Sequence, residues 1–110
     1  MIYTREDLFE MREEMAGYRD RIRSKLKSAP EGRIMITTRK GRPNYFRNLY
    51  DEKGERIRRE GITRKRSMIA DLAIKEYNVE LLSLLDEDIR LLDRLLLKFR
   101  DPLPKTIIKE

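Results

Sequence analysis

The sequence contains no cysteine and no histidine among its 110 residues. The first absence excludes disulfide bonds and thiol chemistry, and the second removes imidazole as a general base or a metal ligand. The few glycines are isolated, so no glycine-rich phosphate loop is present. Residues 86–88 are consecutive acids, and consecutive side chains on a helix point in different directions, which suits a solvated face better than a metal site. We therefore expect no catalytic residue, no metal and no cofactor.

Long hydrophobic runs are also missing. A membrane span needs about 20 apolar residues, and the longest leucine cluster, at 91–97, is interrupted by Asp93 and Arg94. Residues 1–9 lack the apolar stretch and the cleavage site of a secretory signal. These features predict a cytoplasmic protein with no membrane partner and no small-molecule substrate.

Positive charge is concentrated in one segment. The chain carries a net charge of +6, and residues 31–66 hold twelve basic and five acidic side chains, more than the whole excess. A basic excess confined to one segment is typical of proteins that bind polyanions. The alternative is a solubilising surface, and charge alone does not separate the two.

Apolar residues recur every three or four positions near the start of the chain. This stripe predicts an amphipathic helix over residues 5–27. Thr4, followed by Asp7 three residues later, resembles a capping box at its beginning. Pro30 and Gly32 predict its end.

A second helical pattern occupies the C-terminal half. It predicts a helix over residues 64–77, capped by Thr63, and a leucine-rich helix over 79–100, followed by a tail at 101–110. The two helices could also be one. The leucine stripe indicates a coiled-coil seam, either within one chain or in a homodimer. The residues expected in this seam or in self-association are Leu85, Ile89, Leu92, Leu96 and Phe99.

Residues 33–60 change to the pattern of β-structure. β-branched and aromatic residues alternate with polar ones in three short stretches, separated by turn sequences at 40–43 and 51–54. The expected fold is therefore α+β, a single domain over 1–110 with a long helix, a three-stranded antiparallel meander and a helical C-terminal half. We expect four side chains to pack the sheet against a helix: Ile34, Ile36, Phe46 and Ile57.

The basic side chains of the sheet and of the following helix start are the candidate nucleic-acid site. Arginines bind phosphates, and aromatic side chains stack on unpaired bases. The candidate residues are Arg33, Arg39, Lys40, Arg42, Tyr45, Arg47, Arg56, Arg58, Arg59, Arg64, Lys65 and Arg66. The competing interpretation is that Tyr45 is an ordinary strand residue and that the arginines form a solvated face.

Three cations at 64–66 begin a helix, where the helix dipole disfavours positive charge. Two explanations stay open. A bound anion such as phosphate would offset the repulsion, or the cations pair with Glu60 or Asp71 of the chain itself.

The segment 33–77 resembles the arm-type DNA-binding domain of phage and transposon tyrosine recombinases. The resemblance rests on the turn Asp51-Glu52-Lys53-Gly54, on the basic stretch 56–59, and on the helix entry Thr63-Arg64-Lys65. It implies a three-stranded sheet followed by a helix, with the exposed sheet face inserted in the major groove of DNA. The long helix at 79–100 departs from this family.

Nearly the whole chain is more loosely similar to uncharacterised proteins of bacterial mobile elements. The similarity rests on Pro30-Glu31-Gly32 and on the box Leu72-Ala73-Ile74-Lys75-Glu76-Tyr77. The expected function is therefore nucleic-acid binding, with duplex DNA favoured, in a phage or mobile element. The alternative is a protein-binding inhibitor of a host defence nuclease, similar in action to an anti-CRISPR protein, that docks on a protein or nucleoprotein complex.

Overall fold

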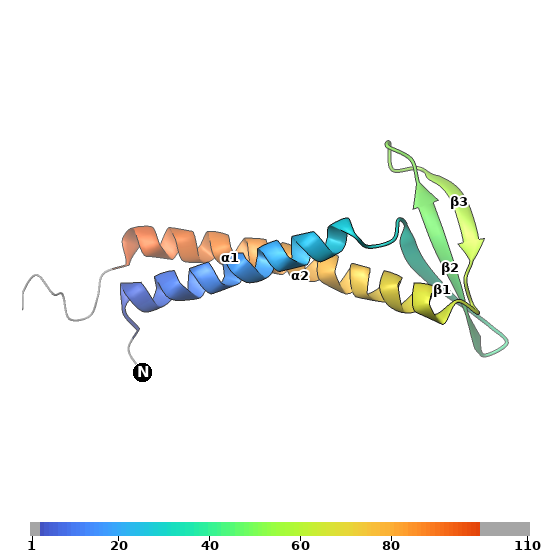
Figure 1. Cartoon of the computed structure of the whole chain (residues 1–110), viewed down its shortest axis with the longest axis horizontal. Helices are drawn as coiled ribbons and strands as arrows, with labels where there is room; N and C mark the ends of the chain where they lie inside the picture. Colours follow the sequence, from blue (N-terminus) through green and yellow to red (C-terminus); the bar gives the residue numbers. More distant parts are fainter. Residues whose placement is uncertain (1–2, 100–110) are drawn as a thin grey trace, which may run out of the picture. The chain divides into compact units, whose positions relative to one another are not determined.

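The computed structural model describes residues 3–99 and confirms the α+β fold (Figure 1). Helix α1 (Arg5–Lys27) is followed by strands β1 (Arg33–Arg39), β2 (Arg42–Tyr50) and β3 (Arg56–Gly61), and then by helix α2 (Arg66–Lys98). The expected tail at 101–110, and residue 100 of the expected last helix, lie outside the described residues. Within residues 3–99, no helix combines the length and apolar character that crossing a membrane requires.

The chain divides into two compact units. The first, here called the helix pair, comprises α1 up to Arg23 and α2 from Leu81 onwards. The second, here called the sheet unit, comprises residues 24–80, with the three strands and the first half of α2.

Helix α1 begins as its sequence predicts. Thr4 and Asp7 form a reciprocal capping box, because the Thr4 amide donates to Asp7 Oδ2 at 2.9 Å and the Asp7 amide donates to Thr4 Oγ1 at 3.2 Å. Along the helix pair, α1 and α2 run antiparallel (Figure 1). Leu8 and Ile22 from α1 and Ile89 and Leu96 from α2 are buried in this unit. The leucine stripe thus forms a seam within one chain.

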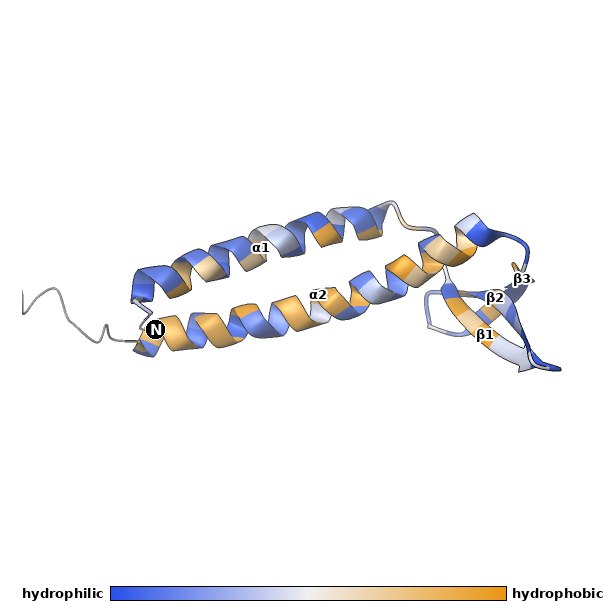
Figure 2. Cartoon of the chain, turned by 90° about the horizontal axis from the view of Figure 1, so that it is seen from below, coloured by the Kyte–Doolittle hydropathy of each residue, from blue (hydrophilic) through white to orange (hydrophobic). Residues whose placement is uncertain are grey.

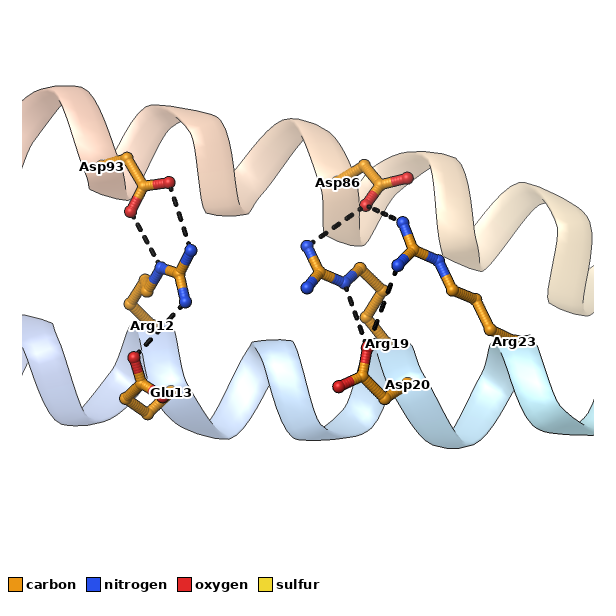
Figure 3. Close-up of polar contacts among 7 residues, drawn as sticks. All are labelled: Arg12, Glu13, Arg19, Asp20, Arg23, Asp86 and Asp93. Carbon is orange, nitrogen blue, oxygen red and sulfur yellow. Dashed lines mark hydrogen bonds and ion pairs between the residues drawn. The ribbon is translucent and has the colours of Figure 1, made fainter.

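One flank of the helix pair is bridged by ion pairs (Figure 3). Arg12 Nε lies 2.8 Å from Asp93 Oδ1, and Arg19 Nη1 lies 3.6 Å from Asp86 Oδ1. The two arginines are seven residues apart, as are the two aspartates, so the contacts repeat once per heptad. The hydrogen bond from Arg12 lowers the pKa of Asp93, which opposes the effect of partial burial. Arg23 also lies 3.5 Å from Asp86.

Helix α2 carries more apolar surface than α1 can cover. Figure 2 shows hydrophobic residues over much of α2, whereas α1 is mainly hydrophilic. Leu84, Leu91 and Leu95 remain exposed on a second stripe beside the seam.

Helix α2 is a single helix rather than two. No glycine or proline interrupts residues 66–98, so nothing forces a break near Asn78. It begins two residues later than expected, since Thr63 does not cap it. Thr63 Oγ1 instead accepts a hydrogen bond from the Tyr45 amide at 3.1 Å, which ties the helix entry to β2.

The sheet is an antiparallel meander in the order β1-β2-β3. Lys40 and Gly41 form the two-residue turn between β1 and β2, with φ angles of 51° and 76°. Two positive values are the mark of a type I′ turn, whose twist matches that of the flanking strands. In the second turn, Asp51 Oδ1 accepts the amides of Lys53 and Glu55, both at 2.9 Å, and Gly54 supplies a φ of 82°.

The register assigns side chains to the two faces of the sheet. Ile34 pairs with Arg47, and Met35 pairs with Phe46, so Ile34 and Phe46 lie on opposite faces. The face of Arg47 is directed at α2, because Arg47 Nη1 lies 4.0 Å from Met68 Sδ. We call it the helix side, and the face of Met35 and Phe46 the open face.

The expected set of core residues is therefore wrong in part. Phe46 is on the open face, and Ile36 and Ile57 are 57% and 66% exposed. Ile62 and Leu72 instead are fully buried in the sheet unit. Neither lies in a strand, so strand alternation gave no signal for them.

Candidate nucleic-acid interface

Three of the twelve candidate residues form ion pairs with carboxylates in residues 3–99. Arg33 Nε lies 2.9 Å from Glu76 Oε1, and this hydrogen bond raises the pKa of Arg33. Arg47 and Lys65 share Glu60, at 3.0 Å and 3.2 Å. The pKa of Glu60 is lowered, mainly by the hydrogen bond from Arg47 and next by that from Lys65, which keeps this carboxyl ionised at neutral pH.

Arg47 differs most from the exposed position that the sequence predicted for it. Its side chain is only 19% exposed, and it lies on the helix side between Glu60 and Met68. Tyr45 is half-buried on the same side, opposite Ile36, and its backbone carbonyl accepts from the Ile62 amide at 2.9 Å. Neither side chain belongs to the exposed cationic surface.

Five other cations gather at one end of the sheet. Arg39, Lys40 and Arg42 form the β1-β2 hairpin tip. The hydrogen bonds that Tyr45 makes with Ile62 and Thr63 place the start of α2 beside β2, three residues (about 10 Å) from Arg42. The helix start brings Arg64 and Arg66 to this end.

We call these five residues the tip cluster: Arg39, Lys40, Arg42, Arg64 and Arg66. Among residues 3–99, none of them has a carboxylate within ion-pair distance.

The first turn of α2 contains no acidic residue to offset its dipole. Of the two explanations for the cations at 64–66, pairing with Glu60 holds for Lys65 alone. Arg64 and Arg66 have no carboxylate partner within residues 3–99 at this positive end of the helix dipole.

The arginines of β3 lie on both faces of the sheet, and a β-bulge determines the face of Arg56. Leu49 pairs with Arg58, but the next β2 residue, Tyr50, pairs with Arg56, which leaves Ile57 as the extra residue. Arg56 is thereby brought to the open face, together with Arg59, while Arg58 lies on the helix side.

Arg59 is held against the open face rather than extended into solvent. Its guanidinium carbon lies 5.3 Å from the centroid of the Phe46 ring, a cation–π distance. Its Nη2 also lies 3.8 Å from Met35 Sδ. Asn48, beneath these side chains, is only 7% exposed, and its Nδ2 lies 3.7 Å from the same sulfur.

Sequence reasoning missed three features of this site. The first is the pairing of Arg47 with Glu60, which depends on the register that places the two residues opposite each other. The bulge reverses the side on which Arg56 lies, and Phe46 with Met35 supplies an apolar floor under Arg59. An acid within the basic stretch was the available signal for the first; the other two depend on strand register.

No group of three or more acidic side chains able to hold a metal ion occurs in the described part of the chain. No protein-family model, curated protein or solved structure matches the chain.

Proposed function

We propose that the protein is a non-catalytic nucleic-acid-binding module, with duplex DNA as the favoured ligand, and that the tip cluster is its main contact with phosphates. The observation that carries the proposal is the gathering of five cations at one end of the sheet without a carboxylate partner in residues 3–99. Arg33, Arg47 and Lys65 are paired with Glu76 or Glu60. The β3 arginines also have no carboxylate partner within residues 3–99, but they are divided between the two faces of the sheet, whereas the tip cluster brings five such cations together.

Three local features of the tip cluster are unfavourable in the isolated chain. Arg39 and Arg42 are directly paired across the strands, and like charges in this arrangement repel. Lys40 has the left-handed conformation, which costs a non-glycine residue roughly 1 kcal/mol. Arg64 and Arg66 lie at the wrong end of a helix dipole. A phosphate backbone offsets the two electrostatic penalties at once.

The shape of the sheet supports duplex DNA over other polyanions. A twisted antiparallel ribbon fits the major groove of B-DNA. The resemblance of residues 33–77 to arm-type DNA-binding domains, and the looser one to mobile-element proteins, favour the same ligand. Arg56 and Arg59, on the open face, would lie near the groove while the tip cluster reaches the backbone.

The test compares two double charge reversals. Arg39→Glu/Arg42→Glu alters the tip cluster, and Arg90→Glu/Arg94→Glu, on exposed residues of α2 in the helix pair, changes the net charge by the same amount. Affinity for a random duplex is measured by fluorescence anisotropy at several salt concentrations. We expect the tip variant to lose binding strongly and to reduce the salt slope by about 2, since each phosphate contact contributes about 0.9. The control variant keeps the wild-type slope.

Equal weakening by both variants would show a response to net charge alone and would contradict a defined site. Competition with single-stranded DNA and with RNA duplex establishes which nucleic acid binds best. A wild-type protein that binds none of them rejects the proposal.

A second candidate function has its own observation. Leu84, Leu91 and Leu95 are exposed along two heptads of α2, and such a stripe suits packing against another helix, from a homodimer or from a different protein. In this candidate the chain inhibits a host defence nuclease by docking on it or on its bound nucleic acid. It predicts one stable protein complex and weak affinity for free duplex, which co-purification and anisotropy distinguish.

A further inference from the structure

The open face carries an ordered series of cross-strand pairs. Starting from the hairpin tip, the pairs of β1 and β2 that the register assigns to this face are Arg39–Arg42, Thr37–Asn44, Met35–Phe46 and Arg33–Asn48. In the last pair the Arg33 side chain is bonded to Glu76 of α2. Successive pairs on one face are two residues apart, or about 7 Å. Thr37–Asn44 is thus the only uncharged polar pair of this series that adjoins the tip cluster.

Both polar side chains of this pair are available to a ligand. Thr37 is exposed and Asn44 is partly exposed. In the described part of the chain, neither the Thr37 hydroxyl nor the Asn44 amide has a hydrogen-bond partner. Asn48, on the same strand and face, differs because it is covered and lies against Met35. The Asn44 amide is thus a free donor and acceptor on the sheet surface, one pair away from Arg39 and Arg42. A side-chain amide in such a position can hydrogen-bond to the edge of a base.

Base edges require this chemistry in the major groove. An asparagine amide donates to adenine N7 and accepts from its N6 amino group, and a threonine contacts the thymine methyl group or an acceptor through its hydroxyl. Phosphate contacts from neighbouring cations fix the register in which such side chains meet the bases. The arginine pair of the tip cluster, about 7 Å away, is suitably placed for that role.

We propose that the Thr37–Asn44 pair is a specificity-determining element that reads the major-groove edge of an adenine–thymine pair in duplex DNA. The inference rests on the proposed function, because it needs a duplex bound at the tip cluster. It adds sequence preference to what the cations alone provide, since a charge-only contact binds all sequences alike.

The experiment begins with the wild-type chain and a random duplex pool, from which bound sequences are selected and read. The selected duplex is then compared with a scrambled one in binding to wild type, Asn44→Ala and Thr37→Val. Thr38→Val is the matched control, because Thr38 is the adjacent exposed threonine on the opposite face, paired with Pro43. Circular dichroism melts verify that each variant is folded.

We expect Asn44→Ala to lose about ten- to a hundredfold of the preference for the selected duplex, the value of one bidentate base contact. Its salt slope and its affinity for the scrambled duplex stay at the wild-type values. Thr37→Val loses less, and Thr38→Val nothing. Replacing the selected adenines by 7-deazaadenine, which removes the N7 acceptor, weakens wild type but leaves Asn44→Ala unchanged.

The outcomes separate the two proposals. Wild type that binds duplex without sequence preference, or Asn44→Ala that keeps the full preference, overturns the inference and leaves the proposed function in place. A wild-type chain without duplex affinity overturns both.

Discussion

Replacing Lys40 by asparagine should make the protein more stable and a weaker binder of nucleic acid. Lys40 is the only non-glycine residue with a positive φ in the described chain, at 51°. Asparagine tolerates this conformation better than lysine, and the penalty for an ordinary side chain is roughly 1 kcal/mol. We therefore expect Lys40→Asn to raise the free energy of unfolding by about 0.5–1 kcal/mol and the melting midpoint by a few degrees.

The same change removes one cation from the tip cluster. Loss of one phosphate contact reduces the salt slope by about 0.9, which near 0.1 M salt corresponds to roughly five- to tenfold weaker binding. Urea denaturation followed by circular dichroism gives the stability, and anisotropy across a salt series gives the slope. The control is Lys53→Asn, in the other hairpin turn, where φ is not positive and no strain is relieved.

Each half of this expectation can fail separately. If Lys40→Asn is less stable than wild type, the turn is not strained. If its salt slope equals that of wild type, the hairpin tip does not contact phosphate. A loss of binding as large in the Lys53 variant would show that both ends of the sheet respond to charge alike.

Three further predictions concern stability. Gly32→Ala should destabilise the fold by at least about 1–3 kcal/mol, because Gly32 has a φ of 98° and an added Cβ would lie 2.7 Å from the Asn48 carbonyl oxygen. Gly17 lies in open space within α1, so Gly17→Ala should instead stabilise the fold by about 0.5–1 kcal/mol. Urea denaturation measures both changes. Leu72→Ala should lower the free energy of unfolding by about 2–5 kcal/mol since Leu72 is 0% exposed, whereas Leu97→Ala, at a position 85% exposed, should change it by less than about 0.5 kcal/mol. The lowered pKa of Asp93 contributes stability that is fully present above the pKa of this group in the unfolded chain, about 4, and is lost as the pH falls through the lower folded pKa. Thermal melts of wild type and Asp93→Asn should therefore differ at pH 7 and converge in acid, once the pH is below the folded pKa of Asp93.

The helices were predictable because their signals are local. Apolar spacing, the Thr4–Asp7 box and the absence of glycine and proline from 66–98 each act within one or two turns of chain. The antiparallel meander followed from two turn sequences in the same way. The sequence alone does not decide whether residues 64–100 form one helix or two, since Asn78 is compatible with both a cap and a helix interior.

The faces of the sheet were less predictable because they depend on register. The two-residue turn sets Arg39 opposite Arg42, and this places Phe46 with Met35 rather than with Ile34. A change of one residue in a turn moves every following side chain to the other face. The bulge in β3 adds a second such change, which periodicity alone does not reveal.

The candidate site was predictable in its location but not in its composition. Counting charges identified the cationic segment. The neutralisation of Arg47 by Glu60, however, depends on cross-strand pairing. The neutralisation of Arg33 depends on Glu76, a helix residue 43 positions away. The joining of the hairpin tip with the start of α2 likewise depends on tertiary contacts, made by Thr63 and Ile62 with Tyr45.

The two facing arginines at the hairpin tip make the thermal stability of the protein depend on whether an anion is bound between them. Arg39 and Arg42 repel each other while nothing lies between them, and any multivalent anion that settles there removes the repulsion and binds the folded chain alone. Phosphate and sulfate also stabilise folded proteins in general, so the comparison needs Arg39→Glu/Arg42→Glu as a control. The gain in melting temperature over chloride of equal ionic strength should be larger for wild type than for this variant. Melting temperatures in different buffer anions then show whether an anion binds at this end of the sheet, before the natural ligand is identified.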